Sequence, residues 1–152
     1  RVWEAGLAYG IHPGTPNPAE RIESGLLSYR CDCAGSATPL EAGLGRFLTL
    51  DRDDEFVGKA ALLAERESGP ARRLVKVSLS GDRLASPSEH PWSALDTDGS
   101  PVGEVRVAVW SPALGSNLAL ALVEASAAGS GFTALTPDGD ELVATHLSFF
   151  GE

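Results

Sequence analysis

The stretch SALDTDGSPVGEVRVAVW, residues 93–110, places Asp98–Gly99 between two extended runs of alternating apolar residues. An Asp-Gly pair in this setting is a strong signal for a β-hairpin, because glycine readily takes the positive φ of a tight turn. The same arrangement returns around Asp138–Gly139 in GFTALTPDGDELVATHLSFF, residues 131–150. We therefore expect both pairs to lie at hairpin tips, with Gly99 and Gly139 at positive φ.

Two further segments extend this β-rich half of the chain. RLVKVSLS (73–80) alternates with a period of two, as a half-buried strand does. NLALALVEA (117–125) also predicts a strand, although its Ala and Leu content would suit a helix as well. Five or six short strands with tight turns, over about 80 residues, predict a small antiparallel β-barrel or jelly roll.

The chain before Ala71 follows a helical period instead. FVGKAALLAERESG (56–69) predicts an amphipathic helix, ended by Gly69–Pro70. Its apolar side would consist of Phe56, Ala60, Leu63 and Ala64.

Two weaker helices are expected further upstream. VWEAGLAYG (2–10) could be the end of one, weakened by Gly6 and Gly10, and GIHPGTPNP (10–18) predicts a Pro- and Gly-rich loop. Asn17–Pro18 then predicts a helix start that places Ile22 and Leu26 on one face. The fold class is thus α+β, with a helical and mixed part at 1–69, a barrel at 70–152 and a boundary within 68–72.

Charge and composition exclude several functions. The net charge of −9 disfavours nucleic acid as a partner, and no apolar run approaches the roughly 18 residues that span a membrane. Arg72, Arg73 and Lys76 form the one basic cluster of the sequence, which we interpret as a solvated face. The N-terminus has no secretion-signal pattern, and its opening Arg, rather than Met, suggests that upstream sequence has been removed.

The cysteines and histidines do not form a metal-binding pattern. Cys31 and Cys33 are too close for an unstrained disulfide, and no third cysteine exists. His12, His90 and His146 are scattered without ligand spacing, so we predict no metal site. Free thiols without a secretion signal predict the reducing cytoplasm.

RIESGLLSYRCD, residues 21–32, places Arg21, Glu23, Tyr29 and Asp32 around an apolar centre. Taken singly, each fits an ordinary role: ion pairs for Arg21 and Glu23, the rim of the core for Tyr29, and a turn for Asp32. Taken together, they suit recognition of a flat polar heterocycle, because a carboxylate accepts N–H bonds from an amino-pyrimidine edge while apolar walls cover the ring. No phosphate loop, nucleophile elbow or metalloprotease motif is present, so no catalytic residue is predicted.

RIESGLLSYRCD is followed in order by TPLEAGLGRFLTLD, FVGKAAL and GEVRVAVWSPALGSNLALALVE. This ordered set resembles the folate-dependent aminomethyltransferases, the family of the glycine-cleavage T-protein. The family pattern runs R-x-E-x-G, Y-G-x-D, P-x-E-x-G-L, F-x-G-K-x-x-L and S-P-x6-A-x3-V. GIHP (10–13), HPW (90–92) and VWSP (109–112) are more similar to its tetrahydrofolate-dependent demethylase branch.

The resemblance implies three domains around a central folate hole, in chains more than twice this length. Residues 1–69 would then be the C-terminal part of the folate-binding domain, and residues 70–152 the family's C-terminal barrel. An upstream region of the same protein would supply the catalytic acid and much of the pocket. Glu23 and Tyr29 would face folate or the donor, Arg21 would fix Glu23 or another carboxylate, and Trp110 would pack between barrel and pocket.

Two departures from the pattern bear on the reaction. Arg30 stands where the family has the glycine of Y-G-x-D, and Asn17 stands where the T-protein has a folate-contacting arginine. Asn17 argues against plain glycine cleavage, so we expect a demethylase-like enzyme that moves a one-carbon unit from a small methylated N, O or S donor to tetrahydrofolate. The alternative is a non-catalytic interaction or folding module that keeps only the family's architecture.

Overall fold

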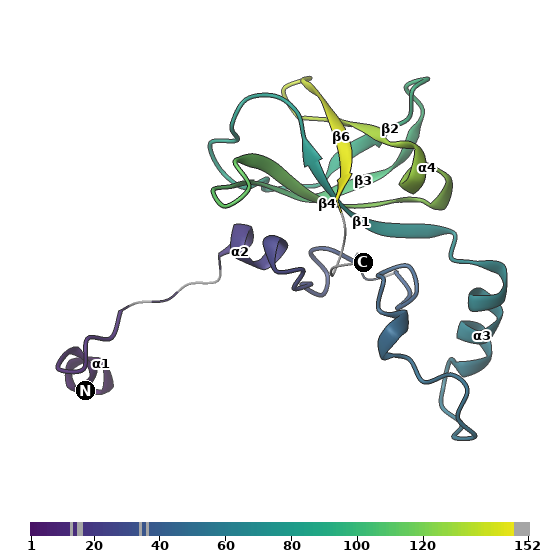
Figure 1. The fold of residues 1–152 in the computed structure, drawn as a ribbon, viewed down its shortest axis with the longest axis horizontal. Coiled ribbons are helices and arrows are strands. Elements are labelled where there is room, and N and C mark those ends of the chain that lie inside the picture. The colour runs from purple at the N-terminus through teal and green to yellow at the C-terminus, as the bar shows by residue number, and fades with distance from the viewer. Residues whose placement is uncertain (13, 15–16, 34, 36, 148–152) are drawn as a thin grey trace.

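The structure is a computed structural model that describes residues 1–12, 14, 17–33, 35 and 37–147. Its helices are α1 (Val2–Leu7), α2 (Pro18–Glu23), α3 (Lys59–Ser68) and α4 (Ala125–Ser130), with a 3-10 turn η1 at Gly45–Phe47. Its strands are β1 (Arg72–Leu79), β2 (Trp92–Leu95), β3 (Pro101–Ser111), β4 (Ser116–Glu124), β5 (Phe132–Leu135) and β6 (Glu141–Leu147). Figure 1 shows the strands gathered in one body, with α1 apart from it and α3 standing below.

The strands close into an antiparallel barrel in the order β1-β4-β3-β2-β5-β6, and β6 pairs back with β1. The predicted α+β chain with a small antiparallel barrel is therefore confirmed, and the barrel is closed. The segment at 117–125 forms a strand, not a helix, because β4 lies between β1 and β3 and its backbone groups bond to both.

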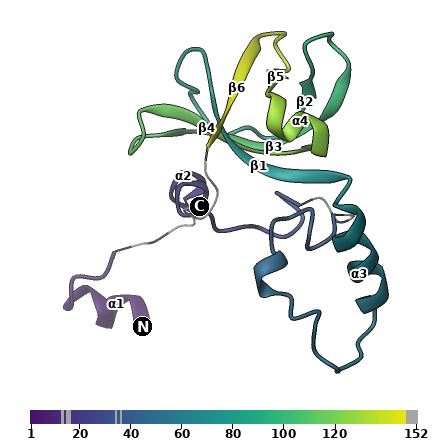
Figure 2. The same cartoon turned by 45° about the vertical axis from the view of Figure 1, so that its right-hand side comes forward.

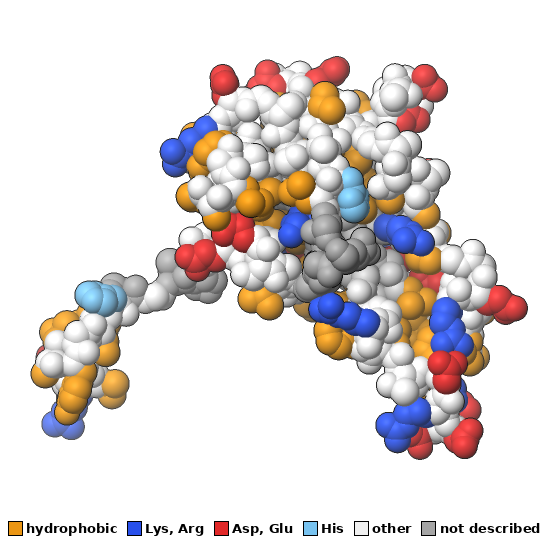
Figure 3. Space-filling view, in the orientation of Figure 1, with side chains coloured by type: hydrophobic (Ala, Val, Ile, Leu, Met, Phe, Trp, Pro, Cys, Tyr) orange, Lys and Arg blue, Asp and Glu red, His pale blue; other side chains and the backbone are white. Residues whose placement is uncertain are grey.

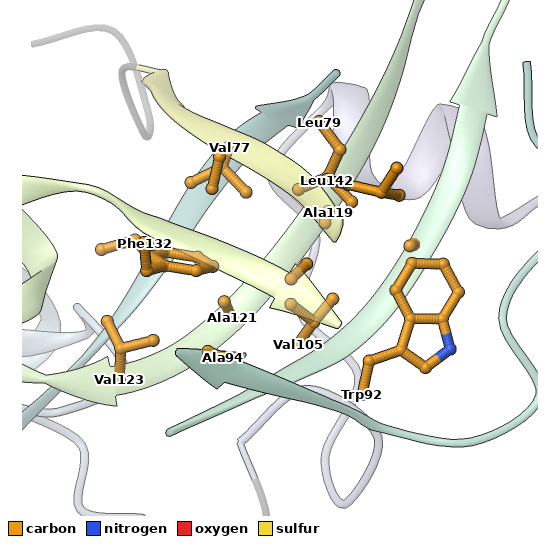
Figure 4. Close-up of a cluster of buried hydrophobic side chains, with 14 of the residues drawn as sticks. Val77, Leu79, Trp92, Ala94, Val105, Ala119, Ala121, Val123, Phe132 and Leu142 are labelled. Atoms are coloured by element: carbon orange, nitrogen blue, oxygen red, sulfur yellow. The ribbon is translucent and has the colours of Figure 1, made fainter. Parts of the chain in front are cut away.

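The barrel interior is filled by the inward-facing side chains of all six strands (Figure 4). Alanines from β2, β3, β4, β5 and β6 leave room for the rings of Trp92 and Phe132. Alternating small and large residues allow the walls of a narrow barrel to approach.

Both predicted hairpins are confirmed. Gly99 and Gly139 have φ of 79° and 90°. Each glycine N–H donates to a carbonyl three residues earlier, that of Asp96 at 3.1 Å and that of Thr136 at 3.0 Å. The two tips connect β2 to β3 and β5 to β6.

A second apolar cluster covers the outer face of β1, β4 and β3. Leu118, Leu120 and Leu122 of β4 point outward there and contact the N-terminal segment, residues 1–68. Ile22 of α2 is completely buried in this cluster. Figure 2 shows α2 beside the barrel while α1 lies apart from it. The packing of α2 fixes the position of the polar residues of 21–32.

Two helix predictions need correction. Leu26 does not share a helical face with Ile22, because α2 ends at Glu23 and Gly25 turns the chain with φ of 71°. The helix predicted from Phe56 begins at Lys59, after Gly58 at φ of 94°. The alanines of its expected apolar side are exposed. Parts of the predicted loop at 10–18, namely 13, 15 and 16, lie outside the described residues, as do residues 148–152.

Candidate functional site

Helix α2 is a short helix with a defined start and end. The side-chain oxygen of Asn17 accepts from the N–H of Ala19 at 2.9 Å, and Pro18 occupies the first helical position. At the other end, the N–H of Leu26 donates to the carbonyl of Arg21 and that of Gly25 to Ile22, the Schellman pattern that a positive-φ glycine permits. The predicted start of α2 at Asn17–Pro18 is confirmed.

Arg21 pairs with Asp32. Its Nη1 atom lies 2.5 Å from Asp32 Oδ2 and also donates to the carbonyl of Leu26 at 3.2 Å. The same Oδ2 accepts the backbone N–H of Ser28. Asp32 is completely buried, and its other oxygen, Oδ1, has no hydrogen-bond partner within the described part of the chain. Arg21 thus holds a buried carboxylate, and that carboxylate is Asp32 rather than Glu23.

Glu23 is held from the barrel. The hydroxyl of Ser111, at the end of β3, donates to Glu23 Oε1 at 2.5 Å, and Ser111 Oγ accepts the N–H of Leu114 at 3.0 Å. Ser111 is fully buried and Glu23 half-buried. This contact spans 88 residues of sequence and fixes the C-terminal end of α2 against the barrel.

Trp110 lies close to the N-terminal end of α2. It lines a shallow pocket of about 200 Å³ together with Asn17 and Ala19. The guanidinium of Arg83 lies 5.5 Å from the centroid of its ring, within reach of a cation–π interaction. Trp110 therefore sits at the junction between barrel and N-terminal segment.

Tyr29 differs from the other three predicted residues in its exposure. Its side chain is 77% exposed, so it is not at the rim of the core. Arg30, which follows it, has φ of 72° and is the one non-glycine residue at positive φ in the described chain. Arg106 of β3 donates to the carbonyls of Arg30 and Cys31 and holds this strained turn against the barrel.

Two charged side chains that the sequence did not single out, Glu41 and Lys59, fix the N-terminal segment. Glu41 is buried and accepts from Arg72 Nε and Nη2 at 2.9 Å each. Lys59, the first residue of α3, donates to the carbonyls of Arg52 and Asp54 at 2.6 and 3.1 Å. It thereby holds the loop at 52–54 against the start of α3. Glu41 lies in the family motif P-L-E-A-G-L and Lys59 in F-V-G-K, and these motifs were the sequence feature that could have pointed to both residues.

The described residues contain no group of three His, Cys, Asp or Glu side chains placed to hold a metal ion. Both cysteines are free, Cys31 exposed and Cys33 buried. Burial, and then the neighbouring Asp32 carboxylate, raises the pKa of the Cys33 thiol, so this thiol is a poor nucleophile. Among the described helices, none has the length and apolar character to cross a bilayer.

The sequence is similar to those of known proteins over most of its length. Residues 72–147 match the glycine cleavage T-protein C-terminal barrel domain. The dimethylsulfoniopropionate demethylase DmdA of Ruegeria pomeroyi is 38% identical over 98% of this chain, and an aminomethyltransferase of Caldanaerobacter subterraneus is 35% identical over 86%. The chain spans 40% and 34% of these two relatives.

A solved structure shows the same fold. The glycine cleavage system aminomethyltransferase T from Bartonella henselae superimposes with a TM-score of 0.72 at 21% identity. The match covers 84% of this chain and 36% of that one. It therefore includes much of the N-terminal segment as well as the barrel.

Proposed function

This chain belongs to the glycine cleavage T-protein family, and from that membership we propose that the protein carrying it is a tetrahydrofolate-dependent methyl- or aminomethyltransferase. The reaction moves a one-carbon unit from a small methylated N, O or S donor to tetrahydrofolate. The names of the relatives, a demethylase and several aminomethyltransferases, support this class of reaction. An upstream region of the same protein would complete the pocket.

The observation that carries the proposal is the meeting of three motifs at α2. Arg21 of R-x-E-x-G binds Asp32 of Y-x-x-D, and Glu23 of the first motif binds Ser111 of S-P. These residues are far apart in sequence, yet the fold brings them onto one short helix and its surroundings. An ion pair and a hydrogen bond to these buried partners, Asp32 and Ser111, fix side-chain positions, which a reaction based on orientation requires.

The residues present fit one side of a pterin ring. Glu23 uses one carboxylate oxygen for Ser111, and its Oε2 makes no hydrogen bond to the described residues, so it can accept N–H from an amino-pyrimidine edge. Tyr29, which is exposed, and Trp110, which lines the pocket beside α2, are the aromatic side chains that could cover a ring face. When bound, tetrahydrofolate supplies the nitrogen that accepts the one-carbon unit.

The roles of the chain's own residues follow from these contacts. Glu23 binds and orients the ring, while Ser111 keeps the Glu23 carboxylate in place. Asp32 binds Arg21 and the backbone N–H of Ser28, and so fixes the turn after α2 that carries Tyr29. These residues position the bound ring, and positioning requires no nucleophile from this chain.

Titration calorimetry with tetrahydrofolate on the full-length protein tests the proposal. Glu23→Gln is expected to weaken binding at least tenfold, because a carboxylate bond to an N–H edge is lost. Glu20→Gln, on the exposed side of the same helix, is the matched control and should change affinity less than twofold. No binding heat in the unmodified protein would refute the proposal and favour the non-catalytic module.

A further inference from the structure

A cleft of about 850 Å³ opens where the N-terminal segment meets the barrel. Its walls come from the loop at 40–46, the end of α3, the start of β1, α4 and the end of β6. Figure 3 shows several basic side chains on the face where these parts join, and acidic ones along the far rim of the barrel. The cleft is larger than the shallow pocket beside Trp110.

The cleft carries an excess of positive charge in an acidic protein. Three arginines from three different elements line it: Arg46 of η1, Arg66 of α3 and Arg73 of β1. Glu41 is the one acidic residue among the described lining residues, and Arg72 binds both of its oxygens. The net charge of the whole chain is −9, so this concentration of guanidinium groups runs against the composition.

Two of the three arginines can turn to a ligand at low cost. The side chain of Arg73 is exposed and makes no ion pair or hydrogen bond within the part of the chain that the structure describes. Arg66 pairs with Asp51, but both side chains are largely exposed, at 46% and 82%. Exposed pairs of this kind contribute little free energy and exchange readily for another anion.

The remaining lining suits a carbon skeleton. Leu40, Pro70, Val75 and Ala125 give the cleft apolar walls between the charged groups. Its volume lies in the range of small-molecule sites, about 300–1,000 Å³. Guanidinium groups bind carboxylate and phosphate oxygens in pairs, which favours anions of planar or tetrahedral shape.

We propose that this cleft binds a small organic polyanion, a carbon skeleton that bears two or more carboxylate or phosphate groups. The cleft is separate from the cluster at α2. Arg73 pairs with Val123 and Trp110 with Asn117, six residues apart on β4, which corresponds to about 20 Å along the strand. The proposal therefore does not depend on folate binding at Glu23.

Calorimetric titration of the 152-residue chain with citrate and, separately, with fructose 1,6-bisphosphate tests this site. Sodium chloride at matched ionic strength serves as the reference. Arg73→Gln is expected to weaken binding at least tenfold and Arg66→Gln at least threefold. Arg52→Gln removes the same charge from an exposed pair with Asp54 outside the cleft and should change affinity less than twofold.

The outcomes separate the possible ligands. Binding of citrate alone supports a carboxylate ligand, and binding of the bisphosphate alone supports a phosphate ligand. No heat beyond the chloride reference, or equal weakening by Arg73→Gln and Arg52→Gln, would overturn the site. Circular dichroism melts of all three variants establish that each is folded. A failure of tetrahydrofolate to bind the full-length protein would leave this result unaffected.

Discussion

The guanidinium of Arg72 and the carboxylate of Glu41 form a bidentate ion pair, in which the Nε–Oε1 and Nη2–Oε2 distances are both 2.9 Å. Arg72 begins β1, whereas Glu41 belongs to the N-terminal segment, and its carbonyl also accepts the N–H of Leu74. The pair thus joins the segment to the barrel, 31 residues apart in sequence. Because Glu41 is buried while Arg72 is 37% exposed, the contact is partly shielded from water.

Glu41→Gln should lower the free energy of unfolding by about 1–3 kcal/mol at neutral pH, because one member of a charged pair is left without its partner. Arg72 is partly exposed, which keeps the loss below that of a fully buried pair. Urea denaturation measures it. Glu67→Gln, on the exposed surface of α3, is the control and should leave the midpoint unchanged.

The same pair predicts a pH dependence. The hydrogen bonds from Arg72 hold the pKa of Glu41 below its ordinary value of 4.5. A carboxyl with a lowered folded pKa stabilises the fold above its unfolded pKa, and this contribution is lost as the pH falls through the folded pKa. Below about pH 4.5, therefore, the unmodified chain should lose stability more steeply than Glu41→Gln. The measurement is the free energy of unfolding of both proteins at several pH values between about 6 and 3, the range of acid unfolding. An equal loss of stability in the two proteins over this range would contradict the prediction.

Ser111→Ala should cost about 1–2 kcal/mol, because Glu23 Oε1 and the N–H of Leu114 both lose their partner. The substitution should also weaken tetrahydrofolate binding by the full-length protein, since Glu23 is no longer fixed. Ser126→Ala, on the exposed side of α4, is the control for stability. A loss of stability without any change in affinity would show that Ser111 supports only the fold.

Gly103 and Gly99 both have positive φ, 152° and 79°, but they differ in the space around an added side chain: Gly103 is crowded and Gly99 is open. A Cβ on Gly103 would lie 2.3 Å from the carbonyl oxygen of Leu122, so Gly103→Ala should push β3 from β4 and cost more than about 3 kcal/mol. At Gly99 no atom lies within 4 Å, and only the positive φ opposes a side chain. Gly99→Val should cost more than about 1 kcal/mol but less than Gly103→Ala. The reverse order in chemical denaturation would contradict this explanation.

The sequence predicted those parts of the fold that local rules decide. The turns at Gly99 and Gly139 follow from an Asp-Gly pair between alternating runs, and the start of α2 from Asn17–Pro18. Gly25 was a local signal that α2 ends at Glu23, before Leu26. The prediction of a longer helix gave more weight to the four-residue spacing of Ile22 and Leu26. Strand order was not accessible, because β1 pairs with β4 and β6, which are distant in sequence.

The candidate site was predicted in its residue types but not in its contacts. Arg21 was expected to fix Glu23 or another carboxylate, and the partner is Asp32, 11 residues away. The partner of Glu23, Ser111, could not be found, because only the docking of α2 on the barrel brings them together. The roles of Glu23, Tyr29, Arg21 and Trp110 toward folate remain predictions.

The isolated 152-residue chain should self-associate. Val2, Trp3 and Leu7 of α1, together with Tyr9, are exposed, and no residue of α1 is buried. Apolar side chains gathered in this way favour contact with a second surface. Light scattering after size exclusion should therefore show species larger than the monomer. Trp3→Glu with Leu7→Glu should restore the monomer, whereas Leu114→Glu, an exposed leucine elsewhere, should not.

The isolated chain should also have no transferase activity. A methyl group must be held within roughly 3–3.5 Å of its acceptor in a site that excludes water. Glu23 and Trp110 are only half-buried and Tyr29 is largely exposed, so these residues form at most one wall. A ring bound there would lie partly in water, and solvent would compete for the Glu23 carboxylate. The measurement is a methyl-transfer assay with tetrahydrofolate and N-, O- and S-methyl donors, on this chain and on the full-length protein. Turnover by the 152 residues comparable to that of the full-length protein would mean that a complete active site lies within them.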